Sequence, residues 1–300
     1  MKRLFVILGL QVLAFREVWH WYVTRAVYSW DQPWGVLALV AAIIFLIASR
    51  KPLPQHERSL LLPALLILTY ATTYFVLPPL ARATIAFTAV AVTLSLLRFG
   101  KAFHAGLFGL IYLSLPTIPT LQFFGGYPLR IVVAELTAPI LRSAGFAVVA
   151  EGTCLNWAGH LIWIDAPCSG IKMVWVGLFL TFAVLCFYEL TFRKTLVLMP
   201  LVGIVIMSAN VFRAVALFYI EAGVLDLPSW SHEYAGVIAF VLEALGIISA
   251  VHFLRLGYHA RIGSTVGAAL RGRPRVELSH RIQTRGRPQR AAPTVTPKSS

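Results

Sequence analysis

Charged residues are scarce in this chain. They make up 13% of the 300 residues, whereas hydrophobic residues make up 58%. This composition, with repeated apolar stretches of membrane-spanning length, excludes an ordinary soluble domain. The stretches also lack the alternation of apolar and polar residues that is typical of a transmembrane β-barrel. The sequence therefore predicts an all-α protein, a polytopic transmembrane helical bundle.

Cysteine is also rare, since Cys154, Cys168 and Cys186 are the only three. Three cysteines are too few for a disulfide framework, and none forms the Cys-x-x-Cys pair of a zinc site. The zincin motif His-Glu-x-x-His is absent, because Gly236 stands where the second histidine would be needed. We therefore expect no metal site and no cofactor.

Acidic residues are outnumbered by basic ones, and the formal net charge is +14. Residues 255–300 alone hold ten Lys and Arg against one Glu. A basic segment beside a membrane span is typical of the cytoplasmic side and of contact with anionic lipid, and no nucleic-acid recognition fold accompanies it. We predict an integral membrane domain over 1–254, with its catalytic portion at about 122–254, and a disordered cytoplasmic tail over 255–300.

Eight apolar segments are predicted to span the membrane: 4–23, 34–49, 59–77, 83–97, 102–121, 170–188, 195–219 and 233–254. One set of alternate loops, with the two termini, holds 19 Lys and Arg, and the other set holds four. This asymmetry predicts that both termini are cytoplasmic and that the connections 122–169 and 220–232 face outward from the inner (plasma) membrane.

The longer outer connection is expected to contain some structure of its own. Apolar residues near helical spacing over 129–143 predict an amphipathic helix along the membrane surface. Phe146–Glu151 and His160–Ile164 are predicted to be extended segments that form a short β-hairpin, with 152–156 as their connection.

Cys168 begins the tripeptide Cys168-Ser169-Gly170, directly before the sixth predicted span. Asp165 and Pro167 are typical helix-start residues, which places Cys168 in a first helical turn. The free amides there favour a thiolate over a thiol whose reference pKa is about 8.5. On local sequence alone, small residues that permit tight packing remain an equal alternative.

Arg213 lies inside the seventh predicted span, about 9 Å from its outer end. A cation at that depth needs an ionic partner or a wet cavity, and Asn210, three residues earlier, shares its helical face. His232 stands at the outer start of the eighth span, and its reference pKa near 6.5 suits proton transfer. Topology alone thus brings Cys168, Arg213 and His232 near one outer surface.

Three motifs in this order resemble those of the exosortase and archaeosortase membrane transpeptidases: Cys168-Ser169-Gly170, Asn210-x-x-Arg213 and His232-x-x-x-Gly236. The resemblance covers roughly 133–254. Lys172 differs from the Arg that many members carry two residues after the glycine.

The resemblance implies a cysteine protease or transpeptidase in which Cys168, Arg213 and His232 form the catalytic set. Ser169, Gly170, Lys172 and Asn210 would be supporting or substrate-binding residues. The implied partners are membrane proteins with a C-terminal sorting signal, which combines a short motif, one transmembrane helix and a basic end. Cleavage would proceed through a thioester on the cysteine.

Two alternatives remain open at this point. Arg213, Lys172 and Glu243 would form a charge pathway in a non-enzymatic transporter or lipid-binding scaffold. A structural subunit of an envelope assembly would need none of these residues beyond folding.

Overall fold

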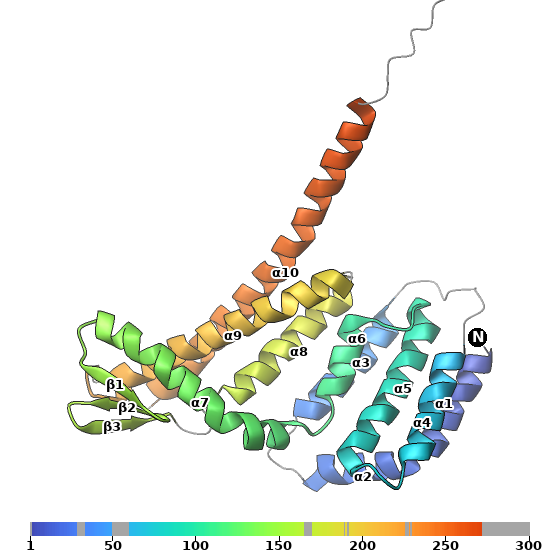
Figure 1. Cartoon of the computed structure of the whole chain (residues 1–300), viewed down its shortest axis with the longest axis horizontal. Coiled ribbons are helices and arrows are strands. Elements are labelled where there is room, and N and C mark those ends of the chain that lie inside the picture. The colour runs from blue at the N-terminus through green and yellow to red at the C-terminus, as the bar shows by residue number, and fades with distance from the viewer. Residues whose placement is uncertain are drawn as a thin grey trace, which may run out of the picture. The chain divides into compact units, whose positions relative to one another are not determined.

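A computed structural model describes residues 2–28, 34–49, 60–164, 170–188, 190, 192–225, 228 and 230–271 of the chain (Figure 1). Contacts divide the chain into one compact unit of Met1–Gly257 and a second of Tyr258–Ser300. Every feature discussed below belongs to the first unit. The predicted disorder of the tail falls mainly on 272–300, outside the described residues.

Helices dominate the described residues. They are α1 (Lys2–Ala14), α2 (Arg16–Tyr28), α3 (Trp34–Ala48), α4 (Leu61–Thr73), α5 (Pro79–Phe99), α6 (Ala105–Leu113), α7 (Ile118–Ser143), α8 (Ile171–Phe187), α9 (Phe192–Glu221) and α10 (Ser231–Arg271). Between α7 and α8 lie three strands, β1 (Val148–Glu151), β2 (Cys154–Trp157) and β3 (His160–Trp163). The predicted all-α class therefore describes most of the chain, with one small sheet added.

Three helical segments are long and apolar enough to cross a membrane: α5, α9 and Ser231–Arg255 of α10. The number becomes five if two bent pairs, α1 with α2 and α6 with α7, each count as one span. The other predicted spans fall on the shorter apolar helices α3, α4 and α8. The described residues thus support a membrane protein, but the predicted count of eight spans is not confirmed.

The predicted fifth span, 102–121, is not one straight helix. Its first part is the nine-residue α6, and α7 continues at an angle of 90°. Pro116 lies in the break, where it supplies no backbone N–H and clashes with a preceding helical turn. From Ile118, α7 continues to Ser143, so the predicted amphipathic helix of 129–143 is only its second half.

The predicted hairpin is also wrong in its pairing. Cys154–Trp157, which was expected to belong to the connection, forms the central strand β2 of an antiparallel meander in the order β1-β2-β3. Both turns are two residues long, and Gly152, Ala158 and Gly159 adopt positive φ angles. Tight turns of this kind let three short strands form where sequence spacing suggested two.

The sheet packs against α7 and the C-terminal half of α9. Val148 and Leu155 join a buried cluster with Leu141 of α7 and Phe218 of α9. Ile164, directly after β3, belongs to the same cluster, and its backbone N–H donates a hydrogen bond to the carbonyl of Thr153 at 3.0 Å. The chain that leads toward Cys168 therefore starts from a fixed, buried point.

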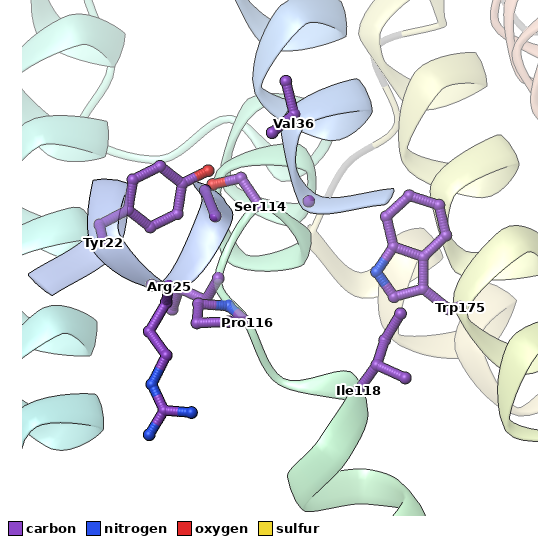
Figure 2. A pocket seen from close by; sticks show the side chains of 10 residues that line it. Tyr22, Arg25, Val36, Ser114, Pro116, Ile118 and Trp175 are labelled. Atoms are coloured by element: carbon purple, nitrogen blue, oxygen red, sulfur yellow. The ribbon is translucent and has the colours of Figure 1, made fainter. Parts of the chain in front are cut away.

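The start of α8 is fixed by Trp175. The indole N–H of this buried side chain donates to the carbonyl of Leu113 at 3.3 Å, at the break between α6 and α7. Its ring stacks on Phe179 with centroids 5.4 Å apart. Figure 2 shows Trp175 and Ile118 on one side of a small cavity, across from Tyr22 and Ser114. The N-terminal helices thus support the first turns of α8.

Replacing Trp175 by alanine is expected to lower the free energy of unfolding by about 3–5 kcal/mol, because it leaves a cavity and an unpaired carbonyl at the helix break. Trp163→Ala is the matched control, since Trp163 is an exposed residue of β3. Thermal unfolding of the purified protein in detergent would measure both. Equal stability of the two variants would contradict the supporting role of Trp175.

Candidate active site

Five of the seven predicted site residues are described, namely Gly170, Lys172, Asn210, Arg213 and His232. Cys168 and Ser169 lie outside the described residues, in the segment 165–169. That segment is bounded by the buried Ile164 and by Gly170, the N-cap of α8. The surroundings of Gly170 are therefore the closest description of the cysteine motif.

Gly170 lies directly against Asn210 of α9. A Cβ atom at Gly170 would be 2.6 Å from Nδ2 of Asn210, a separation that van der Waals radii forbid. Gly170 also has a φ of 85°, a conformation in which only glycine is unstrained. Asn210 is buried, and its Oδ1 has no hydrogen-bond partner among the described residues. A buried amide acceptor is thus held beside the cysteine motif.

Arg213 lies three residues after Asn210, on the same face of α9, and contacts the third motif. A Cβ atom at Gly236 of α10 would be 3.7 Å from Nε of Arg213, an ordinary van der Waals separation. The Gly236 turn of α10 therefore packs against the guanidinium of Arg213. Gly170, Asn210, Arg213 and Gly236 bring the three motifs together on facing sides of α8, α9 and α10.

His232 lies one turn before Gly236 on α10, so both residues share a helical face. Its Nε2 is 3.5 Å from Oε1 of Glu221, the last residue of α9, and both side chains are partly exposed. Glu221 was missed by the sequence reasoning. The available signal was its position in the same short connection, 220–232, that ends at His232.

Lys172 does not join this cluster. It is two residues after Gly170, about 200° around α8, and its side chain is exposed. None of the contacts described above involves Lys172, and its predicted supporting or substrate-binding role stays a prediction.

Glu243 occupies a deeper layer of the same α10 face. It follows His232 by eleven residues, or about three turns, and is buried. A Cβ atom at Gly177 of α8 would collide with the Glu243 carboxyl group and with Ile206. Neither carboxyl oxygen has a hydrogen-bond partner among the described residues.

An apolar groove of about 680 Å³ lies beside the cluster, between α7 and α9. Its lining residues are Leu136, Ile140, Pro200, Gly203, Ile204, Met207, Ser208, Val211, Phe212 and Val215. Val211 and Phe212 directly precede Arg213, so the end of the groove near Val215 reaches the position of Arg213 along α9. At Gly203 no heavy atom lies within 4 Å of the Cβ position.

The described residues can therefore supply a guanidinium, an imidazole beside a carboxylate, and a buried amide around the start of α8. They contain no group of three or more His, Cys, Asp or Glu that would hold a metal ion. Cys154 is a buried free thiol in β2, and Cys186 is a buried free thiol in α8. This combination suits acid–base and electrostatic assistance to a nucleophile next to Gly170.

Gly170→Ala is expected to destabilise the protein by about 1–3 kcal/mol, because the methyl group forces a strained backbone and displaces Asn210. Gly9→Ala in α1 is the control, since no heavy atom lies within 4 Å of its Cβ position. Both variants would be compared by chemical or thermal unfolding. A Gly170→Ala protein as stable as the Gly9→Ala control would contradict the close packing of α8 on α9.

A search of curated proteins and a search of solved structures each returned no match. A family model described as transmembrane exosortase matches residues 23–249. This range includes the sheet, Gly170, the Asn210–Arg213 face and the His232–Gly236 turn. Because the match extends over most of the chain, the protein belongs to the transmembrane exosortase family.

Proposed function

We propose that this protein is a membrane cysteine transpeptidase or protease that cleaves C-terminal sorting signals of membrane-tethered proteins through a thioester on Cys168. Family membership supports a membrane transpeptidase or protease role in general. The observation that carries the specific proposal is the contact of Asn210 with Gly170 and of Arg213 with Gly236. These contacts join the three motifs that sequence alone leaves separate.

Chain connectivity supports Cys168 as the nucleophile. Consecutive Cα atoms are 3.8 Å apart, so two residues before Gly170 means at most about 7.6 Å from its Cα atom. Asn210 lies against that glycine. The described part of α8 begins at Ile171, and the positive dipole end of this helix favours a thiolate in the preceding segment.

The proposed reaction uses His232 twice, first as an acid and then as a base. The Cys168 thiolate attacks the scissile peptide carbonyl, and Arg213 stabilises the thiolate or the developing oxyanion. The C–N bond breaks as His232 donates a proton to the leaving amine, which leaves an acyl thioester. Water, an amine or a hydroxyl then attacks the thioester, gives its proton to His232 and restores the thiolate.

Glu221 is proposed to orient His232. A carboxylate beside one imidazole nitrogen fixes the ring and stabilises its protonated form, as in other nucleophile–base–acid arrangements. The 3.5 Å separation of Glu221 Oε1 from His232 Nε2 supports this role. Glu221 would act through His232 and is a positioning residue.

The active site is proposed to face outward from the inner (plasma) membrane, with both termini cytoplasmic. The loop charges support this orientation, because the four basic residues of the predicted outer loops contrast with 19 on the other side. In this arrangement the tail of 255–300 contacts anionic lipid. The membrane domain of 1–254 carries the catalysis in its portion from about 122.

The apolar groove between α7 and α9 is proposed to bind the transmembrane helix of the substrate. From Pro200 to Val215 it follows α9 for about 22 Å, most of the thickness of a bilayer core. Small residues such as Gly203 and Ser208 allow close approach of a second helix. A helix in this groove would deliver the chain at its outer end to the level of Arg213.

Covalent trapping tests the nucleophile. The full-length protein would be co-expressed with a sorting-signal substrate tagged on the N-terminal side of its cleavage site, because that fragment stays on the enzyme. We expect a tagged adduct that is sensitive to hydroxylamine, and Cys168→Ala should abolish both adduct and cleavage. His232→Ala and Arg213→Gln should each slow cleavage at least about 100-fold.

Cys154→Ala and Cys186→Ala are the matched controls and should retain the adduct, since both are buried thiols that belong to none of the three motifs. Unchanged cleavage by Cys168→Ala would refute the enzyme mechanism. Cleavage that persists in Cys168→Ala but fails in Arg213→Gln would favour the charge-pathway alternative.

Filling the groove tests substrate docking. Gly203→Leu should leave folding intact because the Cβ position is open, yet its side chain would occupy the path of a bound helix. Cleavage at low substrate levels should fall about tenfold while the maximal rate changes less, since binding is weakened. Gly9→Leu in α1 is the control. A folded Gly203→Leu protein with normal cleavage would exclude this groove.

A further inference from the structure

A cavity of about 290 Å³ with charged and aromatic residues in its lining lies in the N-terminal helices, which the proposed reaction does not use. One wall is formed by α2, and the other by Tyr74, directly after α4, and the first turn of α5. The lining residues are Glu17, Val18, His20, Trp21, Thr24, Arg25, Tyr74, Pro79 and Arg82. The cavity therefore joins parts of the chain that are far apart in sequence.

The charge of this cavity favours an anion. Arg25 and Arg82 are its two permanent cations, and Glu17 is its one carboxylate. That carboxylate already forms a salt bridge of 3.0 Å with Arg16, which does not line the cavity. Among the described lining residues, two guanidinium groups therefore stand against one carboxylate, which Arg16 also contacts.

Arg82 is positioned by an aromatic neighbour, and one of its buried N–H groups has no hydrogen-bond acceptor among the described residues. Its Cζ atom lies 4.7 Å from the centroid of the Tyr74 ring, a cation–π contact. Its Nε is buried and has no hydrogen-bond partner among the described residues. A positioned guanidinium with an unused buried donor suits a planar or tetrahedral oxyanion.

The location of the two arginines is unusual for a membrane protein. The predicted outer loops hold only four basic residues, and Arg25 and Arg82, 57 positions apart, are two of them. Basic residues are depleted on the outer side of membrane proteins. Convergence of half of these cations on one cavity therefore indicates a binding role.

The surroundings indicate an anion that carries an apolar part. Trp21 and Tyr74 line the cavity, and such rings concentrate where membrane meets water. Phe75 and Val76, directly after Tyr74, are 94% and 82% exposed. Large apolar side chains with this exposure are expected to face lipid chains in a membrane protein.

We propose that this cavity binds the phosphate headgroup of an anionic membrane phospholipid, with Arg25 and Arg82 as its ligands and the acyl chains along Phe75 and Val76. The site is separate from Arg213 and His232 and does not depend on the proposed reaction. Its volume admits a headgroup, whereas pockets for larger ligands run from about 300 to 1,000 Å³.

The cavity adjoins the support of α8. Arg25 also lines the small cavity that contains Ser114 and Trp175, and Figure 2 shows its guanidinium extending away from both. Trp175 fixes the first turns of α8, which directly follow the cysteine motif. A bound headgroup would therefore lie next to the residues that position this motif.

Lipid titration tests the proposal. Fluorescent phosphatidylglycerol and phosphatidylcholine with identical acyl chains would be titrated onto the full-length protein in neutral detergent. About 0.5 M salt screens the exposed tail more than the cavity. We expect phosphatidylglycerol to bind more tightly, by about fivefold for each guanidinium, and the double variant Arg25→Gln, Arg82→Gln to lose this preference.

Arg130→Gln is the matched control. Arg130 is another predicted outer arginine beside a tyrosine ring, at 6.0 Å, but it does not line the cavity, so the preference should persist. The Cys168→Ala protein should also keep it, which separates this test from the test of catalysis. If the double variant fails to fold, the single variant Arg25→Gln is the substitute, because Arg25 is exposed. Its preference for phosphatidylglycerol over phosphatidylcholine should fall by about fivefold.

Three results would overturn the proposal. One is equal binding of the two lipids by the unaltered protein, and another is an undiminished preference in the folded Arg25 and Arg82 variants. Displacement of phosphatidylglycerol by millimolar inorganic phosphate would identify free phosphate as the ligand and refute the lipid headgroup. We expect that inorganic phosphate does not displace phosphatidylglycerol and that the variants lose the preference for this lipid.

Discussion

Close approach of helices at glycines is the constraint on which the proposed active site depends. Gly170, the N-cap of α8, and Gly177 of α8 lack a Cβ atom that would collide with a neighbouring helix, and Gly236 of α10 packs against Arg213. The space beside each glycine is occupied by a polar side chain from another helix, respectively Asn210, Glu243 and Arg213. Polar groups inside a membrane are costly unless protein surrounds them, and small residues at helix interfaces provide that enclosure. The same glycines thus determine both the packing and the location of the chemistry.

Other elements of the fold hold the start of α8 and the segment before it in position. Trp175 connects the first turns of α8 to the break between α6 and α7, and the buried sheet fixes Ile164 ahead of the cysteine motif. The segment that contains Cys168 therefore runs between two anchored points only a few residues apart. An active site at a membrane surface benefits from such anchoring, because small displacements of a nucleophile strongly reduce its rate.

Several features of the fold could be predicted from the sequence, and the failures have identifiable causes. Apolar composition predicted membrane helices, and α5, α9 and the first part of α10 are long enough to span a bilayer. Hydropathy does not register a helix break, however, so the bend at Pro116 was overlooked. The hairpin prediction failed because β2 is only four residues long and contains Cys154 and Asn156, which are weak strand signals. Glu221 was missed since nothing local distinguishes it from any other acidic residue at a helix end.

The sequence by itself determined the membrane class, the family and the order of the three motifs, because hydropathy and motif spacing are properties of a linear chain. Helical periodicity also placed Asn210 with Arg213, and His232 with Gly236, on common faces. Only the tertiary structure decided which faces meet. It brought Asn210 against Gly170 and Glu221 to His232, and gathered Arg25 and Arg82 around one cavity. The rotation of one helix against another follows from side-chain packing between residues far apart in the chain, and no local pattern encodes it.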